Sequence, residues 1–220
     1  MRMLQPVDSA AAAVRTWPTV ALVRWDRFFE DLEDQLASEE EAERAALDTE
    51  AERLRFARLS LQERLTALSR DASVEIALDL VDGSVVTGPV AAVGPDWVAV
   101  DAGAPSRGAV LVPFAAIESI GMPHADILRS ARGAAPGRLQ ERMTLGFVLR
   151  DLVRRRVPVT VRSAAGRDYR GTIDRAASDH LDLALHDAGA PRRSDLVTGH
   201  RLLPFAAIVA VRLESPVPLV

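Results

Sequence analysis

The chain of 220 residues contains no cysteine, no lysine and no asparagine. Without cysteine it cannot form a disulfide, a thiolate metal site or a cysteine nucleophile. Without lysine it cannot carry the phosphate-binding loop that ends in Gly-Lys-Ser or Gly-Lys-Thr, and it has neither a Gly-x-Gly-x-x-Gly nor a Gly-x-Ser-x-Gly segment. It also lacks any run of about 18 apolar residues, so we expect no membrane span.

The residues that could support catalysis are few. The four histidines form no metal-binding pair of the H-x-x-x-H type and stand at His124, His180, His186 and His200. Asp96 and Asp101 adjoin predicted turns, where aspartate closes loops. We therefore expect a non-enzymatic, cytoplasmic protein with no catalytic residues, no cofactor and no metal. An enzyme remains a third interpretation, to be revived by a deep pocket with converging acids or histidines.

Charge is distributed along the chain in blocks. Residues 24–52 hold 12 acidic and 3 basic residues, a net charge of −9, and residues 53–70 carry a net +4. Residues 73–122 carry −5, residues 123–156 carry +5 and the remainder carries +1. Blocks of alternating sign indicate segments with different roles.

The strongest signal is an internal duplication. Residues 74–100 match residues 157–183 at a shift of 83 positions, with apolar residues alternating at the period of a β-strand. The shift superposes Gly83 on Gly166 at a turn and Gly88 on Gly171 within a strand. The pentapeptide Pro-Phe-Ala-Ala-Ile then occurs at both 113–117 and 204–208.

Each copy has the spacing of five short strands. This pattern predicts an α+β protein in which an N-terminal helical segment precedes a tandem repeat of small five-stranded barrels, Sm-like or SH3-like, joined by a helix. The predicted parts are a disordered extension at 1–22, a helical segment at 23–70, a first barrel at 73–122, a basic linker at 123–156 with a helix at 137–156, a second barrel at 157–214 and a tail at 215–220.

The helical segment contains neither proline nor glycine and is rich in Ala, Leu, Glu and Arg. Capping-box spacing at Ser38 and again at Ser60 predicts a break near one of these residues, giving two or three helices that could form a hairpin. An apolar stripe recurs at helical spacing and consists of Trp25, Phe28, Phe29, Leu32 and Leu36. It either packs against the rest of the chain or forms an interface with a partner or a second copy.

The linker helix is the best candidate for nucleic-acid contact. Its arginines could bind phosphates without reading sequence, and they are Arg142, Arg150, Arg154, Arg155 and Arg156. The simpler interpretation is a basic helix end that compensates the helix dipole. Because arginine is the only basic residue used, and because the first predicted barrel is acidic, we disfavour nucleic acid as the partner.

Two resemblances follow from these residues. The Asp82-Gly83 turn, the mid-strand Gly88 and the ending Pro113-Phe114 resemble Sm-like barrels, whose known use is RNA binding. Sm proteins hold bases through an Asp and an Asn near the third strand and an Arg-Gly pair near the fourth. Here the chain has no Asn, and neither 111–113 nor 202–204 contains Arg-Gly. Residues 24–212 resemble an uncharacterised family of high-GC Gram-positive bacteria through the segments 25–33, WDRFFEDLE, and 94–97, GPDW.

Taken together, the sequence predicts a binding or scaffold protein that acts through protein–protein contacts. The partner is an unknown protein or a second copy. The alternative is a regulator that binds RNA or DNA through the arginine-rich helix.

Overall fold

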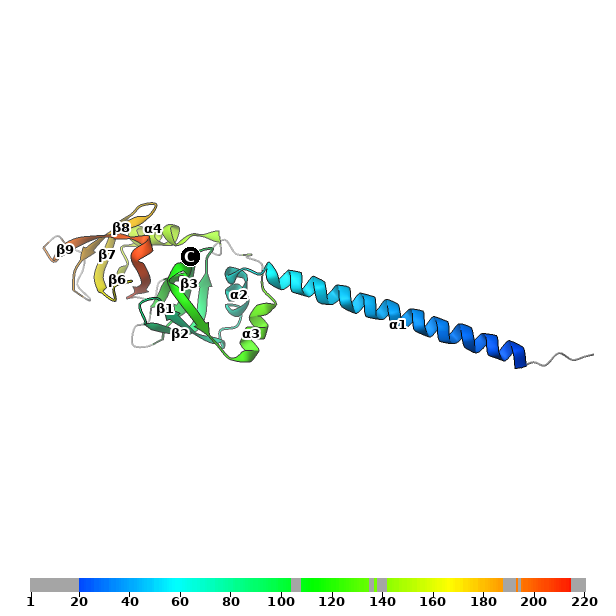
Figure 1. Cartoon of the computed structure of the whole chain (residues 1–220). Helices are drawn as coiled ribbons and strands as arrows, with labels where there is room; N and C mark the ends of the chain where they lie inside the picture. The colour runs from blue at the N-terminus through cyan, green and yellow to red at the C-terminus, as the bar shows by residue number, and fades with distance from the viewer. Residues whose placement is uncertain are drawn as a thin grey trace, which may run out of the picture. The chain divides into compact units, whose positions relative to one another are not determined.

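A computed structural model of the chain describes residues 20–103, 108–134, 137, 142–187, 193 and 195–214 (Figure 1). The chain divides into two compact units, residues 1–57 and 58–220, which are described separately below. The predicted extension at 1–22 lies outside the described residues up to residue 19, and so does the predicted tail at 215–220.

The first unit contains the helix α1, which runs without interruption over Val20–Ala57, 38 residues. The absence of proline and glycine explains its continuity, and ion pairs one turn apart support it, such as Arg44 with Glu40 at 2.8 Å. The helix does not break at Ser38. Ser60 instead begins α2, Leu61–Leu68, with a complete capping box in which the Glu63 amide donates to the Ser60 hydroxyl.

The second unit is built on one antiparallel sheet of ten strands, in the order β5-β1-β2-β3-β4-β10-β6-β7-β8-β9. Its elements are β1 Glu75–Leu80, β2 Val85–Val93, β3 Trp97–Asp101, β4 Ala109–Pro113, β5 Ile117–Gly121, β6 Pro158–Ser163, β7 Asp168–Ala176, β8 His180–Leu185, β9 Gly199–Pro204 and β10 Ile208–Leu213. Each Phe-Ala-Ala of the repeated pentapeptide forms a short 3-10 turn, η1 Phe114–Ala116 and η3 Phe205–Ala207. The prediction of an α+β protein is confirmed, but the prediction of two separate five-stranded barrels is wrong.

Both halves of the sheet use the same strand register. Gly88 lies opposite Ile76 between β2 and β1, and Gly171 lies opposite Val159 between β7 and β6, at the same shift of 83 positions. The β2–β3 and β7–β8 pairings also break at equivalent residues, after Val90 and after Ile173. The sequence matches found at the outset therefore correspond to matched positions in the sheet.

The two halves join through β4 and β10, where Leu111 pairs with Val211. Burial explains why a single sheet results. In β3 and β4 successive side chains are buried on both faces: Trp97, Ala99 and Leu111 pack in one hydrophobic cluster, and their neighbours Val98 and Val110 pack in the other. Two isolated barrels would leave one of these apolar faces in water.

Among the described helices of the second unit, two pack on the sheet and a third packs on one of them. α2 contacts β2, and α4, Leu145–Arg155, contacts β7, the matching strand of the other half. The helix predicted at 137–156 begins later than expected, because α4 starts at Leu145 after the N-cap Thr144. A helix that the sequence analysis did not predict, α3 His124–Ala131, packs against α2.

The start of α4 is held by the first half of the sheet. The Asp96 carboxylate accepts a hydrogen bond from the Leu145 amide at 2.8 Å, which supplies the cap that Thr144 does not. The neighbouring Trp97 indole donates to the Met143 carbonyl, also at 2.8 Å. These contacts place α4 on the sheet.

Candidate protein-binding surface

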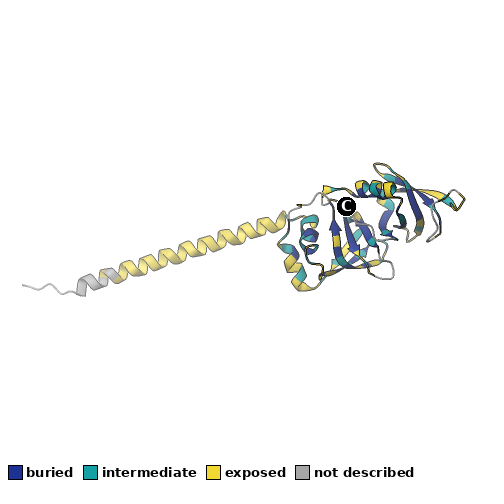
Figure 2. Cartoon of the chain, turned by 180° about the vertical axis from the view of Figure 1, so that it is seen from behind, coloured by how far each residue is buried: buried dark blue, intermediate teal, exposed yellow. Residues whose placement is uncertain are grey.

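The five residues of the predicted apolar stripe lie on α1 and are all exposed (Figure 2). The exposed fractions of their side chains run from 39% at Leu32 to 62% at Trp25. Single exposed apolar residues are common on protein surfaces, whereas contiguous apolar strips on a helix mark binding sites. Exposure alone does not distinguish an interface from an ordinary surface. The arrangement of these residues on the helix is the further evidence for an interface.

The three aromatic residues of the stripe form a cluster at the N-terminal end of α1. The Trp25 and Phe28 rings lie 6.0 Å apart, edge to face, and Phe28 and Phe29 are also 6.0 Å apart. Trp25 and Phe29 are separated by 6.4 Å. These distances are typical of favourable aromatic pairs, so the rings offer a preformed anchor of large apolar area.

The apolar face continues beyond the predicted stripe. Leu47 and Leu54 are 64% and 51% exposed, and they follow Leu36 by 11 and 18 residues, close to whole numbers of helical turns. At about 100° per residue, Trp25, Phe29, Leu32, Leu36, Leu47 and Leu54 fall within an arc of about 60°. We name these six residues the α1 seam. It extends over about 43 Å at 1.5 Å per residue.

Three glutamates interrupt the α1 seam on the same face. Glu39, Glu43 and Glu50 fall within about 40° of Trp25 on the helical projection, and all three are exposed. We name them the seam glutamates. Glu39 accepts a hydrogen bond from the Gln35 amide at 3.2 Å, and Glu50 lies 3.8 Å from the Arg53 guanidinium. Leu47, Leu54 and these glutamates were not predicted from the sequence, although their helical spacing was a readable signal.

The remaining ion pairs of α1 stabilise the helix itself. The Arg55 guanidinium donates to Glu52, and this hydrogen bond lowers the pKa of the Glu52 carboxyl below its ordinary value. The same interaction raises the pKa of Arg55. Pairs of this kind on an exposed helix contribute little to stability because solvent screens them, and they leave the α1 seam exposed.

The arginines proposed for nucleic-acid contact lie on α4 or within three residues of its ends, and all are exposed. Arg154 and Arg155 share one partner, because both guanidiniums bind the Asp151 carboxylate, Arg155 at 2.7 Å. Arg150 donates to the Ala177 carbonyl at 3.3 Å. Arg156 follows the helix with a left-handed backbone, φ 53°, and Arg142 precedes it. Much of the charge is therefore used within the helix end and its neighbours.

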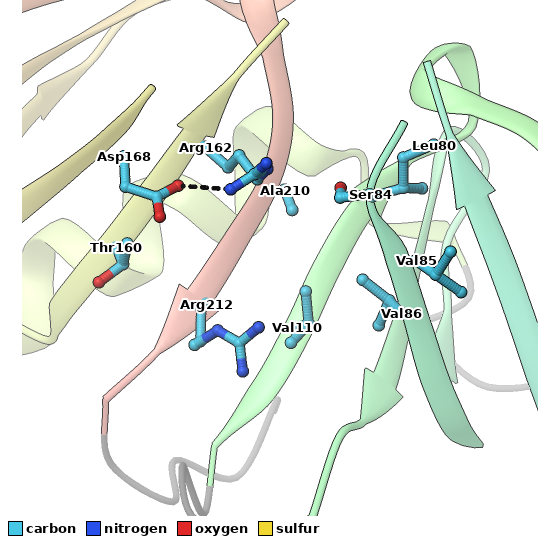
Figure 3. A pocket seen from close by; sticks show the side chains of 10 residues that line it. All are labelled: Leu80, Ser84, Val85, Val86, Val110, Thr160, Arg162, Asp168, Ala210 and Arg212. Atoms are coloured by element: carbon cyan, nitrogen blue, oxygen red, sulfur yellow. Dashed lines mark hydrogen bonds and ion pairs between the residues drawn. The ribbon is translucent and has the colours of Figure 1, made fainter. Parts of the chain in front are cut away.

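A small cavity of about 160 Å³ opens where the two halves of the sheet meet (Figure 3). Its lining combines Val85, Val86 and Val110 with the polar residues Thr160, Arg162, Asp168 and Arg212. Thr160 donates to the Glu214 carboxylate at 3.0 Å, and Arg162 binds Asp168 at 3.3 Å. Among the described residues that line this cavity there is no histidine, and the one carboxylate, Asp168, is paired with Arg162, so this lining offers no acid–base pair.

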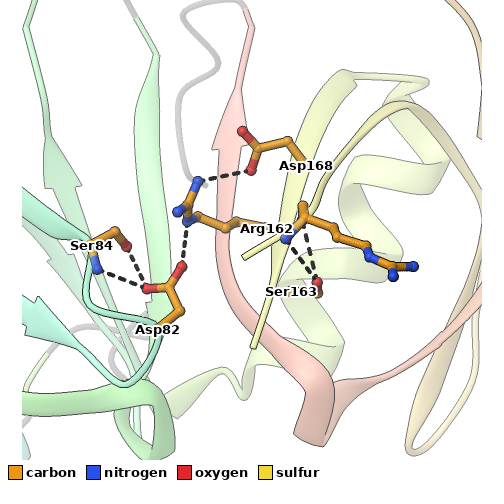
Figure 4. Close-up of polar contacts among 6 residues, drawn as sticks. Asp82, Ser84, Arg162, Ser163 and Asp168 are labelled. Atoms are coloured by element: carbon orange, nitrogen blue, oxygen red, sulfur yellow. Dashed lines mark hydrogen bonds and ion pairs between the residues drawn. The ribbon is translucent and has the colours of Figure 1, made fainter. Parts of the chain in front are cut away.

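Arg162 also joins the two halves (Figure 4). It donates from β6 to the carboxylate of Asp82, in the turn between β1 and β2, and Asp82 also accepts hydrogen bonds from the backbone amide and the hydroxyl of Ser84. Burial raises the pKa of Asp82, but the hydrogen bonds from Ser84 and Arg162 together outweigh it, so the pKa lies below its ordinary value. These contacts fit a structural junction.

The histidines also have structural or exposed positions. His186 is buried and shares a hydrogen bond of 2.9 Å with the Thr172 hydroxyl, and His180 contacts Asp179 at 2.7 Å, which lowers the pKa of that aspartate. No group of three or more histidine, aspartate or glutamate side chains in the described part of the chain is placed to hold a metal ion. None of the described helices has the length and apolar content needed to cross a membrane.

Comparisons of the chain with protein-family models, with curated proteins and with solved structures found no match.

Proposed function

We propose that the protein is a non-enzymatic binding protein that engages another polypeptide through the α1 seam. The observation that carries the proposal is the exposure of six large apolar side chains on one face of a single helix. An isolated helix gains little stability from its own hydrogen bonds, and helical stability comes mainly from packing an apolar face. A partner that covers the seam would supply that packing.

The geometry favours a helical partner. The apolar residues of the seam follow one another at spacings of four, three and four residues from Trp25 to Leu36, which is the pattern that places side chains into the holes of a facing helix. The aromatic cluster around Trp25 adds the kind of anchor that dominates binding energy at interfaces. Recognition would follow the helix-to-helix mode, with affinity from the seam and specificity from the charges beside it.

Site-specific photo-crosslinking in the native host tests this proposal. The full chain carries a benzophenone amino acid at Phe28, beside the seam, or at Asp34, which lies about 180° from Trp25 on the same helix. We expect a discrete crosslinked species of higher mass from the Phe28 position and none from the Asp34 position. Loss of that species after Leu32→Asp and Leu36→Asp would tie it to the seam. Equal crosslinking from both positions, or none from either, would overturn the proposal.

Nucleic-acid binding is the runner-up. The shared pairing of Arg154 and Arg155 with Asp151 reduces the charge that a phosphate backbone would meet. This arrangement supports the interpretation that these arginines compensate the dipole at the C-terminal end of α4.

We also infer that the two halves of the sheet form a tandem repeat. The matched register around Gly88 and Gly171 supports this inference, as does the matched turn of each Phe-Ala-Ala segment. In this interpretation the sheet is a rigid support, and the binding function resides in α1.

A further inference from the structure

We infer that the partner of α1 is a basic amphipathic helix that carries lysine or arginine within its own apolar seam, opposite Glu39, Glu43 and Glu50. This inference rests on the proposed function and specifies its partner. It identifies the partner by chemistry: apolar where α1 is apolar, and cationic where α1 carries the seam glutamates.

The seam glutamates occupy positions within the apolar face of α1. Continued along the helix, the seam runs through residues 25, 29, 32, 36, 39, 43, 47, 50 and 54, and three of these nine positions are glutamate. A partner that covered the apolar positions would also cover the three carboxylates. A carboxylate removed from water without a cationic partner is strongly destabilising, whereas one that meets a cation is not.

A parallel pair of identical α1 helices is disfavoured by charge repulsion. In register, such a pair would place each seam glutamate opposite its own copy. Three layers of like charge would then lie within one seam, next to the further acids that give residues 24–52 a net charge of −9. Like charges directly opposed at an interface are destabilising.

An antiparallel pair of identical helices also leaves the glutamates without cations. If Trp25 lies opposite Leu54 and Leu32 opposite Leu47, then Glu43 faces Leu36 and Glu50 faces Phe29. Glu39 then meets the acidic residues at the centre of the other copy. In this arrangement Phe29 and Leu36 face carboxylates and no seam glutamate faces a cation, so charge complementarity selects a different chain.

The arginines of α1 itself would not neutralise the seam glutamates at a covered interface. Arg53 approaches Glu50 only to 3.8 Å, with its side chain 76% exposed, and Arg44 pairs with Glu40, which lies beside the seam. A net charge of −9 along residues 24–52 would in addition attract a basic partner during encounter, with a rate that falls as salt rises.

The experiment uses the full chain and three synthetic helical peptides of about five heptads that share one apolar seam. The peptides differ only at the three positions opposite the seam glutamates, where they carry lysine, glutamine or glutamate. Each is made in two sequence directions, one for parallel and one for antiparallel pairing with α1. They contain no tryptophan, so a blue shift of the protein's emission that is absent from the Trp25→Phe variant reports cover over Trp25, one of the chain's three tryptophans. Fluorescence anisotropy of the labelled peptides gives the affinities.

We expect the lysine peptide to bind about tenfold or more tightly than the glutamine peptide, and the glutamate peptide to bind weakest. Reversal of the seam charges by Glu39→Arg, Glu43→Arg and Glu50→Arg should transfer the preference to the glutamate peptide. The matched control is Asp31→Arg, Asp34→Arg and Glu41→Arg, which makes the same change in net charge on the opposite face and should keep the preference for lysine. Circular dichroism of each variant checks that α1 is still helical.

Other outcomes separate this inference from the proposed function. Equal affinity for all three peptides would overturn the basic partner and leave the binding role of the seam in place. Sedimentation that shows a dimer, lost in the Leu32→Asp and Leu36→Asp variant, would name a second copy as the occupant and overturn the inference in the same way. Failure of every peptide, together with no crosslink from Phe28, would overturn both.

Discussion

Arg162 and Asp82 lie 80 residues apart in the chain and form an ion pair across the junction of the two halves of the sheet. The Asp82 carboxylate is almost completely buried, with 1% of its side chain exposed, and the Arg162 side chain is 34% exposed. The turn that holds Asp82 and the strand that holds Arg162 belong to different halves. The pair therefore links the halves beyond the short β4–β10 pairing.

We expect Asp82 and Arg162 to be energetically coupled. Removal of either partner leaves the other with a desolvated charge, so a double-mutant cycle with Asp82→Ala and Arg162→Ala should give a coupling energy of about 1.5–3 kcal/mol in urea unfolding. The control cycle uses Asp71 and Arg129, 2.7 Å apart but 43% and 44% exposed, where solvent screening should make the coupling clearly weaker than in the Asp82–Arg162 cycle. Equal coupling in the two cycles would contradict the structural role of the junction.

The lowered pKa of Asp82 predicts a loss of stability in acid. The folded state favours the ionised carboxylate, so its contribution is fully present above the unfolded pKa and is lost as the pH falls through the lower, folded pKa. The difference in unfolding free energy between the wild type and Asp82→Asn should be constant above about pH 5 and shrink below about pH 4. In an Arg162→Ala background the shrinkage should be smaller. A difference independent of pH would refute this assignment.

Much of the fold could be read from local patterns. Five strands were predicted from each copy of the repeat, and each half of the described sheet has five. The capping box at Ser60 begins α2 as expected. The pairing of β4 with β10 was not predicted, because it joins residues about 100 positions apart. Its signal lay in the unbroken apolar runs of β3 and β4, which are typical of strands buried on both faces.

The candidate surface was also read only in part. The apolar stripe of Trp25–Leu36 recurs at every helical turn and was found by this period. Leu47 and Leu54 lie on the same face, but the polar residues after Leu36 obscured their relation to the stripe. The seam glutamates could not be distinguished from ordinary surface charges by residue type, because only their helical angle relative to Trp25 places them on the apolar face. The pairing of Arg154 and Arg155 with Asp151 follows from spacings of three and four residues and was available from the sequence.

Two glycines at matched positions should not tolerate a side chain. A Cβ at Gly88 would lie 2.0 Å from the Asp101 carbonyl oxygen, and one at Gly171 would lie 1.9 Å from that of Ala184. Because these oxygens belong to backbone in neighbouring strands, Gly88→Ala and Gly171→Ala should each lower the unfolding free energy by about 2–4 kcal/mol. Gly199→Ala, with open space around it, is the control and should be close to neutral in urea unfolding. A loss below about 1 kcal/mol at both sites would contradict the close approach.

The left-handed backbone of Arg156 predicts a stabilising substitution. Its φ of 53° is a conformation that favours glycine, and it ends α4 at the position where glycine is most often found. Arg156→Gly should raise the unfolding free energy by about 0.5–1 kcal/mol, measured by urea unfolding. Arg155→Gly, one residue earlier and still in the helix, is the control and should lower it by about 1 kcal/mol. An unfolding free energy lowered in both variants would contradict the assignment.

The arginines of α4 allow a direct decision on nucleic acid. Because Asp151 binds both Arg154 and Arg155, we expect mixed-sequence RNA, single-stranded DNA and duplex DNA to bind more weakly than about 10 μM in fluorescence anisotropy, even at low salt, where attraction to phosphates is strongest. The joint change of Arg154, Arg155 and Arg156 to alanine should then alter binding no more than the same change at Arg167, Arg170 and Arg175, which are also exposed. Micromolar binding with a steep salt dependence, lost only in the first triple variant, would transfer the function from α1 to α4. A weak signal of equal size in both variants would reflect the charge of the whole chain and leave the α1 seam as the binding surface.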